Sequence, residues 1–177
     1  MPVSTIDNSG ISASAAISTS KLGTGAVLQV VQTAKTDTFS TTSAMPTFVD
    51  VTGLSASITP TSSSSKVLVT VTAFLGNGGA SYGSAVNLLR GSTSIAIGDS
   101  RGSTTRCFGG GQTASTANTL PVTVCFLDSP ATTSATTYKV QLSSESGGTA
   151  LIGGSYRSDL AQVVSTPSII TLQEISA

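Results

Sequence analysis

The chain has 177 residues, enough for one domain of ordinary size or one domain with an arm, and too few for two full cores and a linker. Only 9% of its residues are charged, eight basic residues offset eight acidic ones, and roughly a third are Ser or Thr. With a net charge of zero, the chain has no basic surface large enough to neutralise the phosphates of a nucleic acid, so we expect no nucleic-acid binding. With 38% apolar residues the chain can fill a core, so we expect it to fold.

The residue types that are missing narrow the function. The chain has no histidine, which excludes Ser-His-Asp and Cys-His nucleophile pairs and every imidazole metal ligand. It has no tryptophan, the strongest aromatic platform for sugars and bases. The N-terminus lacks a basic and apolar leader, and no later window approaches the roughly 18 apolar residues of a membrane span. We therefore expect no enzyme, cofactor or metal ion, and no membrane insertion.

Residues 1–25 differ in pattern from the rest of the chain. The apolar residues Ile6, Ile11, Ile17 and Leu22 stand alone among Ser, Ala, Thr and Gly, at spacings that match neither a helix nor a strand. One interpretation is an attachment arm whose isolated anchors dock into a neighbouring subunit or a larger particle. The other is a frayed tail. We assign 1–25 as the N-terminal arm and 26–177 as the head domain.

From Val27 onward, short β-type segments alternate with Gly, Ser, Thr and Pro breaks. In residues 66–75 the odd-numbered positions from Val67 to Leu75 share one face, and the even-numbered positions from Leu68 to Phe74 share the other. Both faces are partly apolar, which is typical of a central strand covered on one side by a second sheet and on the other by a partner chain. Gly91-Ser92 predicts a tight hairpin. Further strands are expected at 27–31, 48–58, 86–90, 93–97, 120–126, 138–142, 149–156 and 168–175. Without a helical window, the pattern predicts an all-β protein, an antiparallel β-sandwich of the jelly-roll kind.

A polar, glycine-rich stretch between Gly98 and Asn118 is expected to be a loop. Its Gly109-Gly110-Gly111 run lacks the Lys-Ser/Thr and the strand-to-helix context of a phosphate cradle. The two cysteines, Cys107 and Cys125, permit one disulfide or a redox pair, or are two small buried or half-buried residues. The missing leader favours the last of these.

The carboxylates lie on separate predicted elements. A depolymerase would need two of them brought together across the fold, and a calcium site could use Asp99 or Asp159 with loop carbonyls. Neither has a supporting motif, so no catalytic or metal residue is assigned. The six carboxylates considered are Asp50, Asp99, Asp128, Glu145, Asp159 and Glu174.

The large side chains predicted in loops are the candidates for recognition. Tyr and Arg are the residue types that most often anchor recognition surfaces, although ordinary loop packing also accounts for them. The receptor-contact candidates are Tyr82, Arg101, Arg106, Phe108, Tyr156 and Arg157.

Several segments carry a resemblance to a known family. Lys21-Leu22-Gly23-Thr24-Gly25, Phe48-Val49-Asp50-Val51-Thr52-Gly53-Leu54 and Phe126-Leu127-Asp128-Ser129-Pro130 resemble segments of short virion-surface and tail-fibre-type proteins of tailed bacteriophages. The strand order is also similar to the trimeric jelly rolls of the complement and tumour-necrosis-factor type, which implies a homotrimer. Two-faced apolar strands agree with this, because cyclic symmetry covers them without extra sequence.

The resemblance implies a non-enzymatic virion structural protein of the tail-fibre or adhesin kind. Such a protein is assembled in the host cytoplasm, is displayed on the virion surface, binds other virion proteins through its arm and contacts a host glycan or protein. A capsid decoration, or cement, protein is an alternative of the same class. A free carbohydrate-binding module or a bacterial surface adhesin is the alternative from another class.

Overall fold

The computed structural model describes residues 23–79 and 82–177, which contain strands, turns and no helix. Val, Ile and Thr dominate these strands because β-branched side chains suit a pleated surface. The predicted all-β architecture is therefore confirmed. The strands are β1 (Val27–Lys35), β2 (Phe39–Thr41), β3 (Val49–Ile58), β4 (Lys66–Asn77), β5 (Gly83–Arg90), β6 (Thr93–Ile95), β7 (Gly109–Gln112), β8 (Leu120–Asp128), β9 (Thr136–Ser144), β10 (Ala150–Ile152) and β11 (Ser168–Ile175).

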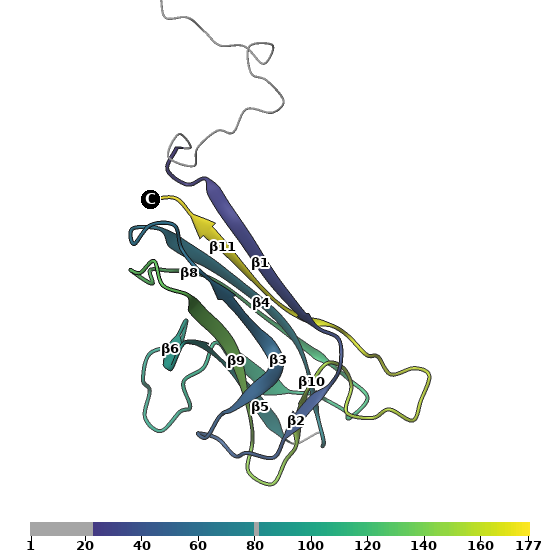
Figure 1. Cartoon of the computed structure of the whole chain (residues 1–177). Coiled ribbons are helices and arrows are strands. Elements are labelled where there is room, and N and C mark those ends of the chain that lie inside the picture. The colour runs from purple at the N-terminus through teal and green to yellow at the C-terminus, as the bar shows by residue number, and fades with distance from the viewer. Residues whose placement is uncertain (1–22, 80–81) are drawn as a thin grey trace, which may run out of the picture.

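The strands form two antiparallel sheets that pack face to face (Figure 1). In the first, which we call sheet A, β4 is central: it pairs with β8 on one side and with β11 and then β10 on the other. β1 pairs with β11, and β2 with β10. In sheet B the order is β3-β9-β5-β6, and β7 also pairs with β5. The predicted β-sandwich is confirmed.

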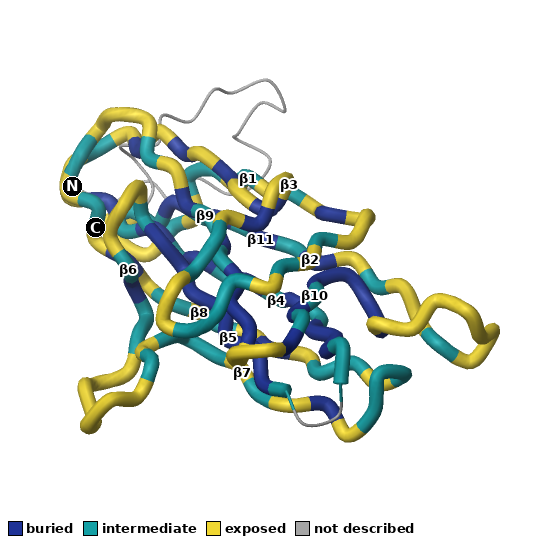
Figure 2. Tube along the Cα trace, turned by 90° about the horizontal axis from the view of Figure 1, so that it is seen from below, coloured by how far each residue is buried: buried dark blue, intermediate teal, exposed yellow. Residues whose placement is uncertain are grey.

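The core lies between the two sheets (Figure 2). β4 alternates strictly, so Val67, Val69, Val71, Ala73 and Leu75 are fully buried. Inward residues of β9 in sheet B face them across the core, and inward residues of β11 lie beside them on the same face of sheet A. The outward residues of β4 are only half-buried, including the predicted apolar pair Leu68 and Phe74. The predicted central position of β4 is confirmed by its pairing with β8 and β11, whereas cover of its outer face by a partner chain stays a prediction.

Two sequence predictions need correction. The Gly109-Gly110-Gly111 run is part of strand β7 and not of a loop. A Cβ at Gly110 would collide with the Ser84 carbonyl oxygen, so only glycine lets these two backbones approach. The strand expected at 149–156 ends at Ile152, because Gly153 and Gly154 adopt φ of 107° and 145° and turn the chain out of the sheet. The predicted Gly91-Ser92 hairpin is confirmed by the pairing of Arg90 with Thr93.

The sandwich has two distinct ends. At one, β1 starts beside the last residue of β11, and the Gly25 amide donates to the Ser176 carbonyl at 2.9 Å. We call this the arm end; the anchors Ile6, Ile11, Ile17 and Leu22 lie outside the described residues. β4 runs from the arm end to Asn77 at the opposite end, which we call the distal end (Figure 1). The loops after β4, β9 and β10 gather there.

Candidate functional site

Two tyrosines among the recognition candidates lie at the distal end, and each rests on a glycine. A Cβ at Gly148 would stand 2.6 Å from Cγ of Tyr82, and a Cβ at Gly78 would stand 3.1 Å from the Tyr156 ring. Both rings therefore lie close against bare backbone, which limits the positions they can take. The Gly78 amide donates to the Thr149 carbonyl at 2.8 Å and holds the two supporting loops together.

Beside Tyr156 the surface forms a hollow of about 300 Å³, which we call the distal hollow. It lies between the loop that follows β10 and the residues Thr38 and Leu151. Three apolar side chains at this loop are exposed: Tyr156 at 42%, Leu160 at 40% and Val164 at 48%. Three serines also line the hollow, and two of them, Ser158 and Ser165, are exposed. Its lining is Thr38, Leu151, Ser155, Tyr156, Arg157, Ser158, Leu160, Val163, Val164 and Ser165.

Arg157 lines the hollow as half of a bidentate ion pair. Its Nε and Nη2 donate to the two carboxylate oxygens of Asp159 at 2.9 and 2.7 Å. The hydrogen bond from Arg157 is the main reason that the pKa of Asp159 lies below its ordinary value. Asp159 is thus an ionised acceptor, and the pair is neutral as a whole.

The other three recognition candidates are grouped elsewhere, in the loop between β6 and β7 at the edge of sheet B. Arg106 is exposed and its Nε donates to the Gly98 carbonyl at 2.7 Å, which closes this loop. The Arg101 carbonyl accepts a hydrogen bond from Thr104 Oγ1 at 2.8 Å. Phe108 packs against the hydrophobic core, so its ring contributes to folding. The six candidates therefore form two groups.

A second concavity, of about 470 Å³, lies where the β6–β7 loop meets β5 and β7. Its floor is made of small residues of the two strands, and Met45, Cys107 and Phe108 stand around it. A small-residue floor follows from the close β5–β7 backbone approach at Gly110, so packing alone accounts for it.

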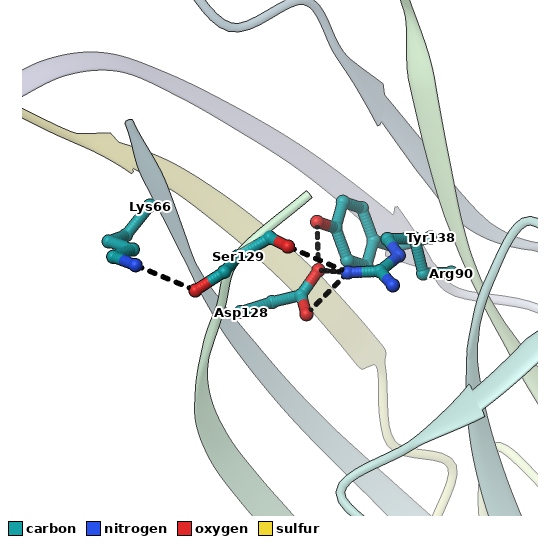
Figure 3. Close-up of polar contacts among 5 residues, drawn as sticks. All are labelled: Lys66, Arg90, Asp128, Ser129 and Tyr138. Atoms are coloured by element: carbon teal, nitrogen blue, oxygen red, sulfur yellow. Dashed lines mark hydrogen bonds and ion pairs between the residues drawn. The ribbon is translucent and has the colours of Figure 1, made fainter. Parts of the chain in front are cut away.

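A polar cluster ties the two sheets together at the arm end (Figure 3). Asp128 of β8 accepts hydrogen bonds from Arg90 Nη1 at 2.8 Å and from the buried Tyr138 hydroxyl at 2.7 Å. Burial, together with the hydrogen bond and the charge of Asp128, raises the pKa of Tyr138, so the hydroxyl remains a donor. Arg90 also reaches the Ser129 carbonyl, and Lys66 Nζ donates to Ser129 Oγ at 2.8 Å. We assign this cluster to stability because its groups satisfy one another.

Glu174 is a second buried carboxylate near the arm end. Its Oε1 accepts from the Thr61 amide and hydroxyl, both at 2.7 Å, and its Oε2 accepts from Gln29 Nε2 at 2.6 Å. Burial by itself raises the pKa of Glu174, but the hydrogen bonds from Gln29, Ser65 and Thr61 outweigh it and leave the pKa below its ordinary value. The ionised side chain thus pins the β3–β4 connection to β1 and β11.

Two further carboxylates of the predicted set, Asp50 and Glu145, also accept hydrogen bonds from nearby donors. Asp50 accepts from Lys139 and Gln141, both at 2.7 Å, and Glu145 accepts from the Gly83 amide at 2.8 Å. Within residues 23–79 and 82–177 no three His, Cys, Asp or Glu side chains are grouped so that they could hold a metal ion. In the same part of the chain, no helix has the length and apolar character needed to cross a membrane.

Both cysteines are free. Cys107 is half-buried in the β6–β7 loop, whereas Cys125 is exposed on β8. The exposure of Cys125 differs from the expected buried or half-buried position, because it points outward from sheet A next to Thr70.

The outward faces of the two sheets differ in charge. On sheet B, Asp50 and Lys139 form an ion pair at 2.7 Å beside Gln141. On the outer face of sheet A, the outward residues of β1, β11, β4 and β8 carry no charge from Lys66 to the distal end. Two apolar residues of this face, Val30 and Leu127, are 56% and 53% exposed. This face comprises Val30, Gln32 and Ala34 of β1, Ile169, Thr171 and Gln173 of β11, Leu68, Thr70, Thr72 and Phe74 of β4, and Pro121, Thr123, Cys125 and Leu127 of β8.

Sequence reasoning missed the partners that shape the distal hollow. Leu160 and Val164 are isolated apolar residues in a polar stretch, and no periodicity marks them as exposed neighbours of Tyr156. No sequence pattern marks Gly78 and Gly148 as the supports of the two tyrosine rings. Their role follows from which loops meet at the distal end, which depends on the sheet order.

Comparison with known proteins leaves these surfaces without an assigned role. No family model matches the chain, and no curated protein matches its sequence. Among solved structures, the chain is similar to one described as the structure of infectious bursal disease virus Gx strain, with a TM-score of 0.38 and 14% sequence identity. The match covers 84% of this chain and 37% of that one, so the chain spans little more than a third of its length.

Proposed function

We propose that this protein is a non-enzymatic structural subunit of a virion surface, of the tail-fibre or adhesin kind. In this proposal it attaches through residues 1–25 and presents its distal loops to the host. The observation that carries the proposal is that the two ends of the sandwich differ. The chain enters β1 at the arm end, next to Ser176, whereas Tyr82, Tyr156 and Arg157 lie at the distal end.

The outer face of sheet A supports assembly from several copies. Its 14 outward residues are hydroxylated, amide-bearing or apolar, so copies related by symmetry meet without like charges opposing each other. The ion-paired face of sheet B is, by contrast, suited to water. We therefore propose that the subunit is a homotrimer whose copies meet through the outer face of sheet A.

Particle incorporation tests the attachment role. The full chain and a chain that starts at Gly23 are each supplied to particles lacking the protein, and both are located by gold labelling in electron microscopy. We expect the full chain on the particle surface and at least about tenfold less of the truncated chain, because it lacks all four isolated anchors. Equal incorporation of both would contradict attachment through the arm, and absence of the full chain from particles would contradict the virion role.

The same images separate the alternatives. A tail-fibre role predicts label at the tail or baseplate, whereas label spread over the capsid lattice would identify a decoration protein. A free carbohydrate-binding module predicts a monomer that is absent from particles.

A further inference from the structure

The distal hollow has the features of a small-molecule site with a preset shape. Its volume of about 300 Å³ lies at the lower end of the range of roughly 300 to 1,000 Å³ typical of such sites, which suits one or two sugar rings. The Tyr156 ring forms one side and is supported from behind by Gly78 and Thr149. An exposed aromatic face backed by protein can stack on an apolar ligand face without losing much side-chain freedom.

The loop that carries the hollow is tied down at several points. The Ser155 amide donates to the Val164 carbonyl at 2.9 Å, and Ser155 Oγ donates to the Ala117 carbonyl at 2.8 Å. The Arg157 amide donates to the Thr116 carbonyl at 3.0 Å. The first bond closes the loop after β10 on itself and the other two join it to the loop before β8, so less ordering of this loop is needed when a ligand binds.

The chemistry of the lining favours a neutral, hydroxyl-rich ligand. Ser158 and Ser165 line the hollow, and their hydroxyl groups can both donate and accept hydrogen bonds. Arg157 has its Nε and Nη2 committed to Asp159, so its charge is already balanced by that carboxylate, which disfavours an anionic ligand. A sugar ring matches this combination, because it has an apolar face for Tyr156 and hydroxyls around its edge.

We propose that the distal hollow binds the terminal one or two units of a neutral carbohydrate, with Tyr156 as the stacking residue and Ser158 and Ser165 as hydrogen-bonding partners. This inference rests on the proposed function, since it names the class of host molecule that the distal end contacts.

Binding of the full chain to an array of neutral mono- and oligosaccharides, with sialylated oligosaccharides alongside, tests the proposal. We expect binding to neutral glycans, weakened at least about tenfold by Tyr156→Ala and retained by Tyr156→Phe, which keeps the ring. Val27→Ala is the matched control, because it also removes an exposed apolar side chain but lies at the arm end, away from the hollow, and it should bind as the wild type does. Thermal melting of each variant shows that the fold is retained.

Each contrary result overturns the proposal in a defined way. Binding that survives Tyr156→Ala, or that Val27→Ala weakens equally, places the sugar elsewhere. Preference for sialylated glycans contradicts the neutral class. A chain that enters particles but binds no glycan on the array overturns the sugar site and leaves the virion role standing, whereas a chain absent from particles overturns that role whatever the array shows.

Discussion

Tyr138 is fully buried, and its hydroxyl needs a partner because an unpaired buried hydroxyl costs roughly 1 to 3 kcal/mol. Asp128 supplies that partner and is itself neutralised by Arg90. The sequence marks Asp128 and Tyr138 as residues of two separate strands. It cannot show that they meet, because β8 and β9 belong to different sheets and their facing follows from the whole fold.

Removal of Asp128 should therefore cost more than removal of the tyrosine hydroxyl. We expect Asp128→Ala to lower the free energy of unfolding by about 2 to 4 kcal/mol, because it leaves the hydroxyl unpaired and Arg90, which is 31% exposed, without its counter-ion. Tyr138→Phe should cost about 1 kcal/mol, because Asp128 keeps Arg90. Urea denaturation of both variants measures the difference. An equal or reversed order would show that the cluster does not stabilise the sandwich in this way.

Glu174 should make the stability of the sandwich depend on acid. Its pKa is lower in the folded chain than the unfolded value of about 4.3, so its contribution is complete above that pH and is lost as the pH falls through the lower folded value. We expect Glu174→Gln to be less stable than the wild type at pH 7 by about 1 to 3 kcal/mol, with the gap narrowing between about pH 5 and pH 3. Other carboxylates cancel in this comparison. A gap independent of pH, measured by denaturation across this range, would contradict the account.

At the scale of elements, the alternating strands were predictable and β7 was not. β4, β8 and β9 carry apolar residues at every second position, which is a direct signature of a half-buried strand. β7 is mostly glycine, so it has no side-chain pattern and its composition is typical of a loop. It is a strand because Gly83 to Val86 of β5 offer it a free edge, which is a tertiary effect.

A single methyl group tests the role of glycine in β7. Gly110→Ala places a Cβ against the Ser84 carbonyl, so we expect β7 to separate from β5 and the stability to fall by about 1 to 3 kcal/mol. Gly98→Ala is the control, because a Cβ there meets no atom within 4 Å. Hydrogen exchange of the β7 amides should accelerate in Gly110→Ala and remain unchanged in Gly98→Ala. Unchanged exchange in both variants would mean that β7 tolerates the methyl group.

At the scale of the whole molecule, the sequence indicated that a strand such as β4 has two apolar faces, but not which other residues share its outer face. That set depends on the registers of β1, β11 and β8 against one another, which join residues up to about 140 positions apart in the chain. The recognition candidates show the same limit. Composition picked out Tyr156 and Arg157, and the loop packing decides that they line one hollow while Arg101 and Arg106 lie elsewhere.

The most direct test of the account is the mass of the purified chain in solution, measured by size-exclusion chromatography with light scattering at micromolar concentration. Two variants replace an exposed hydroxyl-bearing strand residue with lysine: Thr123→Lys on the outer face of sheet A and Ser57→Lys on sheet B. In each case the replaced hydroxyl lies next to the hydroxyl of a threonine on the neighbouring strand. We expect three times the chain mass of 17.5 kDa for the wild type and for Ser57→Lys, and the monomer mass for Thr123→Lys, because symmetry brings the added charges together. A monomeric wild type, or a Thr123→Lys variant that keeps the trimer mass, would contradict it.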